Sequence, residues 1–285
     1  MEISNHIFIM KKLFFIIIIF IIGCNKPITK ETDWEKNNLK GKVKTITETD
    51  LITFKTKDGN SITKPSFTRK TFYDNNGSIT SIIGLGINQS EISKFWFTFD
   101  SVNKEIRDSS YDSFLGKNLS SIRKLDENYN LSEEESYSKG VLFQKELYQY
   151  NSNGLLSDIT TVNNYNVLVS RQTFYYNQKG LQNESKEFNN KNQLESIYIK
   201  KYDSKNKNVE AFTFSADSVL LYKSTKKYDP YGNILEDENF TPSRGKHIRY
   251  SYQYTYDSLN NWTSRIVSAD SIRVNNQTRK IEYYY

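Results

Sequence analysis

The chain has 285 residues with 39 basic and 33 acidic side chains, a net charge of +6, and 14% of its residues are aromatic. This length suits one large domain or two ordinary ones, and so diffuse a charge does not form the clustered basic face of a nucleic-acid-binding protein. Aromatic and β-branched residues recur throughout, which excludes a disordered chain. The low proline and glycine contents, 4 and 12 residues, favour strands joined by polar turns.

Residues 1–23 have the organisation of a secretory signal peptide. Lys11 and Lys12 precede the apolar run LFFIIIIFII at 13–22, which is too short for a membrane-spanning helix of about 20 residues. The sequence IIGC at 21–24 resembles the lipobox of bacterial lipoproteins. This resemblance implies cleavage before Cys24 and attachment of acyl chains such as palmitate to that residue.

A lipid on Cys24 would make the membrane the first partner of the mature protein, since each buried CH₂ contributes about 0.8 kcal/mol. Asn25 is not the aspartate that retains some lipoproteins at the inner membrane, so we expect a cell-envelope location at the outer membrane, on either face. Cys24 is the only cysteine, which excludes an internal disulfide and a cysteine-ligated metal. Secretion also removes nucleic acid as a partner.

Residues 24–40 are polar and are predicted to form a lipidated tether, with one helical turn at residues 33–36. As a flexible coil, residues 25–40 would hold the domain roughly 20 Å from the membrane. We expect residues 41–285 to form one β-hairpin repeat domain, because no linker divides them and a leading strand is predicted from Lys42 to Lys55.

A hydrophobic residue followed by Asp or Asn recurs about every 26 residues. Asp and Asn can start a turn by bonding the backbone two residues on, and a later Gly or Asn can adopt a positive φ. Each unit therefore predicts two strands and two turns, and the domain predicts an all-β antiparallel meander of about 16–18 strands. The eight dipeptides are Tyr73-Asp74, Phe99-Asp100, Leu125-Asp126, Tyr150-Asn151, Tyr176-Asn177, Tyr202-Asp203, Tyr228-Asp229 and Tyr256-Asp257.

The strands alternate with period 2, as in RYSYQYTYDSLNN at 249–261. One face is aromatic and the other polar, so we expect the tyrosines to pack within the sheet, with an exposed aromatic binding track as the alternative. Such a sheet must roll, which predicts a rolled or spiral single sheet or an open barrel. Lys200-Lys201 and Lys226-Lys227 place charge on both faces, and a lipid-facing lysine costs about 2–4 kcal/mol, which disfavours a membrane barrel.

Residues 228–235 read YDPYGNIL. Together with the other copies they resemble the YD repeat of the RHS family, Tyr-Asp-x-x-Gly-x-aliphatic. The resemblance covers residues 69–285 and implies the spirally wound sheets of secreted and surface proteins. Combined with the lipoprotein signal, it implies an envelope lipoprotein, with a relative of RHS toxin shells as an alternative.

The chemistry-bearing residues are few. The two histidines are His6, before or within the signal, and His247, at a strand start, so a zinc site or a serine–histidine triad is not expected. Asn151 and Asn177 replace the turn acid in two copies, which favours turn capping over calcium binding. We therefore predict no catalytic, cofactor or metal site. A hydrolase of polysaccharide or peptidoglycan with two carboxylates stays open as an alternative.

Four Asp-Ser-aliphatic triplets resemble an O-glycosylation motif of some Gram-negative envelopes, although Asp-Ser is also ordinary turn chemistry. The candidate acceptors are Ser101, Ser218, Ser258 and Ser271. The leading hypothesis from the sequence is a non-enzymatic envelope lipoprotein, a repeat scaffold that binds an envelope protein or a glycan along its sheet.

Overall fold

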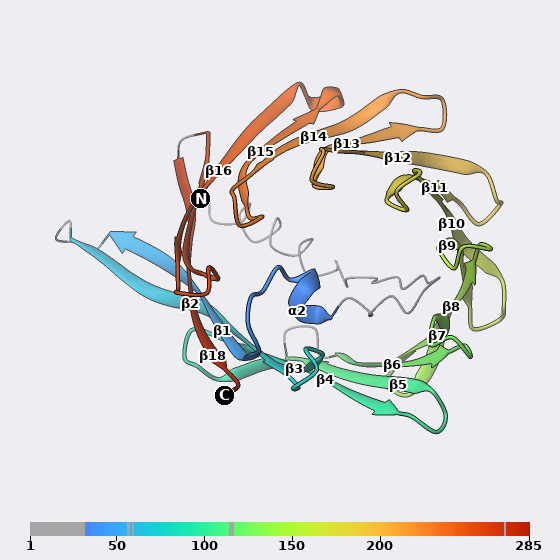
Figure 1. Ribbon diagram of the computed structural model, residues 1–285, viewed down its shortest axis with the longest axis horizontal. Helices are drawn as coiled ribbons and strands as arrows, with labels where there is room; N and C mark the ends of the chain where they lie inside the picture. Colours follow the sequence, from blue (N-terminus) through green and yellow to red (C-terminus); the bar gives the residue numbers. More distant parts are fainter. Residues whose placement is uncertain (1–31, 56–57, 59, 114–116, 271) are drawn as a thin grey trace.

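The computed structural model describes residues 32–55, 58, 60–113, 117–270 and 272–285. The predicted signal peptide with His6, Cys24 and Ser271 lie outside these residues. Over the described ranges the chain forms one antiparallel sheet of 18 strands (Figure 1). These are β1 (Val43–Lys55), β2 (Ser61–Tyr73), β3 (Ile79–Leu85), β4 (Glu91–Asp100), β5 (Glu105–Asp112), β6 (Lys117–Leu125), β7 (Leu131–Ser138), β8 (Val141–Tyr150), β9 (Leu156–Asn163), β10 (Leu168–Tyr176), β11 (Gln182–Phe188), β12 (Leu194–Tyr202), β13 (Asn208–Ser215), β14 (Leu220–Tyr228), β15 (Ile234–Thr241), β16 (Lys246–Tyr256), β17 (Trp262–Ala269) and β18 (Ile272–Tyr283).

The sheet closes into a barrel. Each strand pairs with its successor, and β1 also pairs antiparallel with β18, from Val43 opposite Tyr283 to Leu51 opposite Asn276. The all-β meander, its predicted strand number and the rolling of a single sheet are confirmed, whereas the spiral or open form is not: the sheet is closed. Closure satisfies the backbone groups that the two end strands of an open sheet would leave unpaired.

The predicted turns are nearly uniform. In the copy at Asp203, Oδ1 accepts the backbone N–H groups of Lys205 (2.9 Å) and Lys207 (2.8 Å), while Asn206 donates to the Asp203 carbonyl oxygen (3.1 Å) with φ of 63°. The copies that share this pattern start at residues 74, 126, 151, 177, 203, 229 and 257. Asp100 is the exception, because its Oδ1 accepts from Val102 and Asn103 in a shorter turn.

The short helix α2 (Asp33–Lys36) identifies the inner face of the sheet. It lies within the barrel (Figure 1), and its Trp34 ring contacts the Tyr73 ring at 6.5 Å. Tyr73 therefore faces inward, and strand alternation places every second residue of each strand with it. We call these side chains the inner wall. As predicted, the repeated aromatic residues belong to one face, the inner wall, and the polar residues that alternate with them, such as Lys145 and Arg171, to the outer face.

The segment around α2 docks against the barrel. Asn38 Nδ2 donates to the Tyr231 carbonyl oxygen at 2.8 Å, and the Lys40 amide donates to Asn261 Oδ1 at 2.8 Å. The predicted helical turn is confirmed, and a Thr32 capping box starts it. The expectation of a flexible coil is wrong from residue 32 onward, because these polar residues bond the turns at one end of the barrel. No helix in the described ranges is long and apolar enough to cross a membrane.

A charge cluster joins β18, β1 and β2 where the barrel closes; Glu48 and Arg279 are nearly buried in it, whereas the Arg69 side chain is half-exposed. Glu48 of β1 contacts Arg69 of β2 at 2.7 Å and Arg279 of β18 at 3.6 Å. Burial opposes ionisation of Glu48, but the two arginines outweigh it, so the pKa of Glu48 lies below its usual value. Ion pairing thus links the strands nearest the two ends of the chain.

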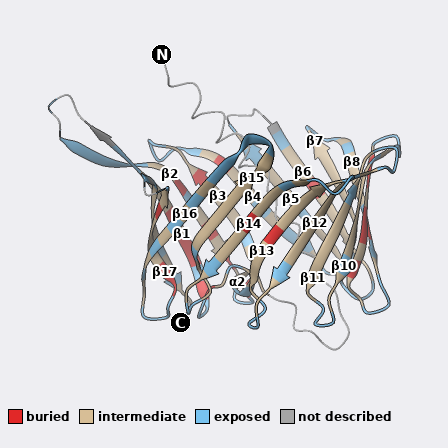
Figure 2. Cartoon of the chain, turned by 90° about the horizontal axis from the view of Figure 1, so that it is seen from above, coloured by how far each residue is buried: buried red, intermediate tan, exposed pale blue. Residues whose placement is uncertain are grey.

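The hydrophobic core is thin. The two clusters of buried residues are Leu39, Val43, Ile46 and Tyr73 beside α2, and Tyr148, Leu156 and Ile159 on β8 and β9. Buried residues are scattered among strands that are mostly of intermediate burial (Figure 2). The aromatic face is therefore not a sealed core, and much of the inner wall meets solvent.

Candidate functional site: the inner wall of the barrel

Tyrosines near the ends of five strands share one kind of hydrogen bond. Each of these hydroxyls donates to a backbone carbonyl oxygen 19 or 20 residues earlier, at the start of the preceding strand, which is the neighbouring strand in the sheet. The pairs are Tyr150 to Leu131 (2.8 Å), Tyr176 to Leu156 (2.8 Å), Tyr202 to Gln182 (2.6 Å), Tyr228 to Asn208 (2.7 Å) and Tyr254 to Ile234 (2.9 Å). The copy at Tyr256 differs, because Tyr254 makes this bond there, whereas the Tyr256 hydroxyl donates to Asp229 Oδ2. Burial raises the pKa of Tyr176 to about 12, so this hydroxyl stays protonated and can donate. The rings are fixed in place while remaining half-buried.

We expect Tyr202→Phe to lower the free energy of unfolding by about 1 kcal/mol, since it leaves the Gln182 carbonyl oxygen without its side-chain donor. The matched control is Tyr175→Phe on the outer face, where the side chain is 46% exposed; its effect should stay within about 0.5 kcal/mol. Urea unfolding of both variants measures the difference. Equal effects would show that the repeated hydroxyl bond does not stabilise the barrel.

Two open cavities lie between β10 and β13, the first beside the inner wall and the second at the rim, where the turns after β10 and β12 meet. The first has a volume of about 280 Å³ and is lined by Gln172, Ser185, Lys186, Glu187, Ser196, Tyr198 and Thr213. The second has a volume of about 450 Å³ and is lined by Asn177, Lys179, Leu181, Asn183, Lys200, Lys201, Tyr202, Asp203 and Asn206. Tyr198, Lys200 and Tyr202 are successive inward positions of β12, so the cavities follow one strand. Their linings combine hydroxyl, amide and ammonium groups with tyrosine rings.

Lys200 is the central cation of this region. Its Nζ donates to Gln182 Oε1 at 3.3 Å and lies 5.4 Å from the centre of the Tyr198 ring. Burial lowers the pKa of Lys200, and the neighbouring cation Lys226 on β14 lowers it further. The inner wall therefore holds a lysine whose charge is costly in the unliganded barrel.

A pair of carboxylates lies elsewhere on the inner wall. Glu134 of β7 is directly opposite Glu146 of β8. Burial raises the pKa of Glu134 and Glu146 adds to the effect, while Arg123 opposes it. Glu146 accepts a hydrogen bond from the Tyr148 hydroxyl at 2.6 Å. Among the described residues, no group of three or more His, Cys, Asp or Glu side chains could hold a metal ion.

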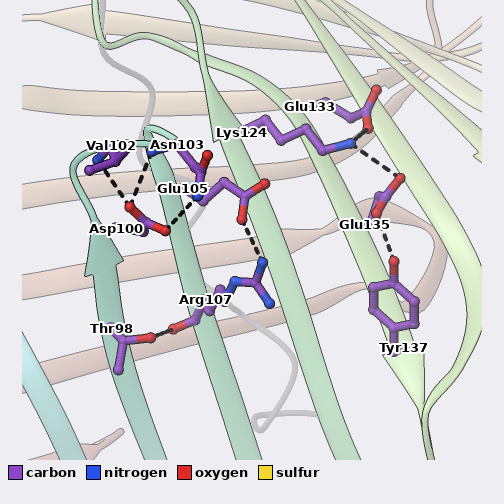
Figure 3. Close-up of polar contacts among 10 residues, drawn as sticks. All are labelled: Thr98, Asp100, Val102, Asn103, Glu105, Arg107, Lys124, Glu133, Glu135 and Tyr137. Atoms are coloured by element: carbon purple, nitrogen blue, oxygen red, sulfur yellow. Dashed lines mark hydrogen bonds and ion pairs between the residues drawn. The ribbon is translucent and has the colours of Figure 1, made fainter.

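The outer face carries ladders of ion pairs. Lys124 lies between Glu133 (2.7 Å) and Glu135 (3.5 Å), as Figure 3 shows, and Lys145 contacts Glu135 at 3.0 Å. Hydrogen bonds from Tyr137 and Lys145 hold the pKa of Glu135 at about 2. These acids and bases neutralise one another, so the outer face presents paired charge on these strands.

The remaining residues singled out from the sequence lie at turns or on the outer face. Ser101, Ser218 and Ser258 are exposed on turns, with Ser101 and Ser258 at the end that holds α2 and Ser218 at the other. Their glycosylation stays a prediction. His247 is exposed on β16 and its ring contacts Phe240 at 6.4 Å. The cavities were not predicted, although the alternation that puts Tyr198, Lys200 and Tyr202 on one face is visible in the sequence.

The fold and site thus define an 18-stranded antiparallel barrel with a polar and aromatic inner wall. No protein-family model and no curated protein matches the chain, so the resemblance to the YD repeat has no support from a family model.

Solved structures give distant likenesses. A porin-like protein from Bacteroides uniformis matches 84% of this chain and 98% of its own at 12% identity and a TM-score of 0.45. A porin-like protein from Bacteroides vulgatus matches 85% and 98% at 10% identity and a TM-score of 0.39. The structure of TcdB2-TccC3-Cdc42 matches 81% of this chain and 14% of that chain at 11% identity and a TM-score of 0.36.

Proposed function

We propose that the chain is a non-enzymatic cell-envelope lipoprotein whose barrel is a scaffold that binds a glycan on its inner wall. The observation that carries this proposal is the row of half-buried tyrosines beside cavities of about 280 and 450 Å³ lined by hydroxyl and amide groups. Small-ligand sites combine aromatic surface with a few placed polar groups, and saccharides offer both an apolar ring face and hydroxyls. An envelope protein is the alternative partner.

The outer face supports a barrel held beside the membrane rather than within it. Outward side chains form ion pairs such as Lys124 with Glu133 at 2.7 Å and Lys227 with Glu236 at 2.8 Å. A lysine facing lipid near mid-membrane costs about 2–4 kcal/mol. In this proposal the acyl chains on Cys24 supply the attachment. The uniform turns suit a YD-like repeat protein, with a relative of toxin shells as the alternative.

The anchor is tested with Cys24→Ser. We expect the protein to move from the membrane fraction to the soluble fraction, since stable attachment needs the acyl chains. Fractionation with an alkaline wash, followed by immunoblotting, measures the distribution. A variant that stays in the washed membranes would show that the barrel itself inserts.

Glycan binding is tested with the full chain purified in detergent, using calorimetric titration with chitotetraose, cellotetraose and tetragalacturonate. We expect saturable binding of at least one oligosaccharide, weakened at least fivefold by Tyr198→Ala. The matched control, Phe212→Ala, removes an outward ring on the neighbouring strand β13 and should leave Kd unchanged. Failure of all three oligosaccharides to bind would overturn the proposed function.

Hydrolysis is a second candidate function, favoured by the Glu134–Glu146 pair. Opposite side chains on neighbouring strands have Cβ atoms about 5 Å apart, and a raised carboxyl pKa suits a general acid. Mass spectrometry of the same incubations would detect shortened oligosaccharides. If the wild type shortens an oligosaccharide and Glu134→Gln does not, the function is hydrolysis and not binding alone. If the oligosaccharides stay intact, the result supports binding alone.

A further inference from the structure

We propose that the inner wall across β12 to β14 is an anion site that selects glycans carrying carboxylate groups. This inference rests on the proposed function and names the chemistry of the ligand. Lys200 of β12 and Lys226 of β14 both face inward, separated by β13 and therefore by about 10 Å across the sheet. On β13, the small buried residue Ala211 is opposite Lys200 on one side and Ser224 on the other, and Lys226 is the next inward residue after Ser224 on β14. The side chains between the two lysines are therefore small.

The ion pairing of neighbouring lysines distinguishes the two faces. Outward Lys201 contacts Glu210 at 3.2 Å, and outward Lys227 contacts Glu236 at 2.8 Å. Their inward neighbours in sequence are Lys200 and Lys226, and within the described ranges neither has a carboxylate oxygen within 4 Å of its Nζ. Each of these strands thus places a neutralised lysine outside and an uncompensated one inside.

Nearby acids are already engaged. Asp237 is opposite Lys226 in the strand register, but its Oδ1 accepts the Ser224 hydroxyl at 2.8 Å. At the other end of the region, Asp203 Oδ1 accepts two backbone N–H groups of its own turn. A ligand carboxylate could therefore approach Lys200 and Lys226 without displacing a side-chain ion pair.

The charged form of Lys200 is unfavourable in the empty barrel. Burial and the repulsion from Lys226 both lower the pKa of Lys200. A carboxylate bound between the two cations would reduce both unfavourable contributions, because opposite charge favours the protonated form and hydrogen bonds to ionised groups are strong. Anion binding thus removes an electrostatic penalty that the empty barrel retains.

The larger cavity supplies the groups that a sugar ring needs beside its carboxylate. Lys179 Nζ donates to Asn206 Oδ1 at 3.2 Å and so links two neighbouring turns at its edge. Asn183 Oδ1 is buried and has no hydrogen-bond partner. Tyr202 contributes a ring whose hydroxyl is fixed. Cation, amide and aromatic ring therefore lie together in about 450 Å³, next to a smaller cavity lined by further hydroxyls.

The test compares tetragalacturonate with its fully methyl-esterified form, which has the same length and no charge. Calorimetric titration of the full chain at low salt should give at least tenfold tighter binding of the acid. Lys200→Met and Lys226→Met should each reduce that preference about fivefold or more, and Lys200→Arg should retain it. The matched control Lys227→Met removes an outward lysine that lines neither cavity and should leave the preference unchanged. Circular dichroism verifies that each variant is folded.

The outcomes separate this inference from the proposed function. Equal binding of the acid and the ester would overturn the anion site while leaving a glycan-binding barrel. A preference for the acid that survives Lys200→Met and Lys226→Met would also overturn it, because the carboxylate would then bind elsewhere. Failure of the acid, the ester, chitotetraose and cellotetraose alike to bind would overturn the proposed function itself.

Discussion

Glu48→Ala is expected to lower the free energy of unfolding by about 3 kcal/mol, the lower end of the range for removing one partner of a buried ion pair, because the partner Arg69 is half-exposed. Glu48 is the carboxylate that Arg69 and Arg279 share across the closing strands. Burial lowers the pKa of Arg279 to about 10. The nearby Glu48 opposes this effect, and repulsion from Arg265 adds to it. Without Glu48, the positive charges of Arg69, Arg265 and Arg279 would repel one another with one carboxylate fewer to offset them.

The matched control is Glu105→Ala, which breaks the Arg107–Glu105 pair on the outer face, where the arginine side chain is 57% exposed. Its effect should stay below about 1 kcal/mol. Urea unfolding at neutral pH measures both variants. Equal destabilisation would show that the cluster where the strands close is no stronger than a surface pair.

The pH dependence of this effect has a defined sign. The pKa of Glu48 is lower in the folded state than its usual value, so the unfolded chain binds more protons over that interval. The stabilisation by Glu48 is therefore complete above the unfolded value of about 4.3 and is lost as pH falls through the folded value. We expect the difference between the wild type and Glu48→Ala to shrink in acid.

Trp34→Ala is expected to lower the free energy of unfolding by about 3 kcal/mol, at the lower end for loss of a buried aromatic side chain. Trp34 Nε1 donates to the Val43 carbonyl oxygen at 2.8 Å, and its ring contacts Tyr73. The ring also fills the space beside Gly77, where an added Cβ would lie 2.7 Å from it. Removing it leaves a cavity and an unpaired carbonyl oxygen.

The matched control for this substitution is Trp96→Ala on the outer face, where the residue is 39% exposed. It should cost about 1 kcal/mol or less, because solvent replaces the lost contacts. Thermal unfolding ranks the two variants, and hydrogen exchange of the Val43 amide reports whether the docked segment is released. A larger effect at Trp96 would contradict the docking role of Trp34.

The local features of the fold could be predicted from the sequence. Turn starts such as Asp203 and Asp229 bond their own backbone within four residues, so their positions follow from nearby residues alone. The face of each tyrosine follows from the period of the strand. The same period predicts that Lys200 and Tyr198 share a face, although the cavities beside them require three-dimensional packing.

The long-range features could not be predicted. Pairing of β1 with β18 joins residues more than 200 positions apart, and the dipeptide repeat carries no signal for it. Docking of Trp34 beside Gly77 likewise depends on a contact between a polar N-terminal segment and a distant turn. The turn at Asp100 could not be predicted from the dipeptide either, since the same residue type starts a shorter turn there.

The docked N-terminal segment also determines how far the barrel could stand from a bilayer. Thr32 Cβ lies 3.1 Å from the Cβ position of Gly77, at the end of the barrel that carries the Tyr-Asp turns. The eight residues 25–32 cover at most about 28 Å when the backbone is fully extended. A lipid on Cys24 would therefore keep this rim within about 28 Å of the headgroups. The opposite rim would then point away from the bilayer and offer large oligosaccharides the less obstructed approach.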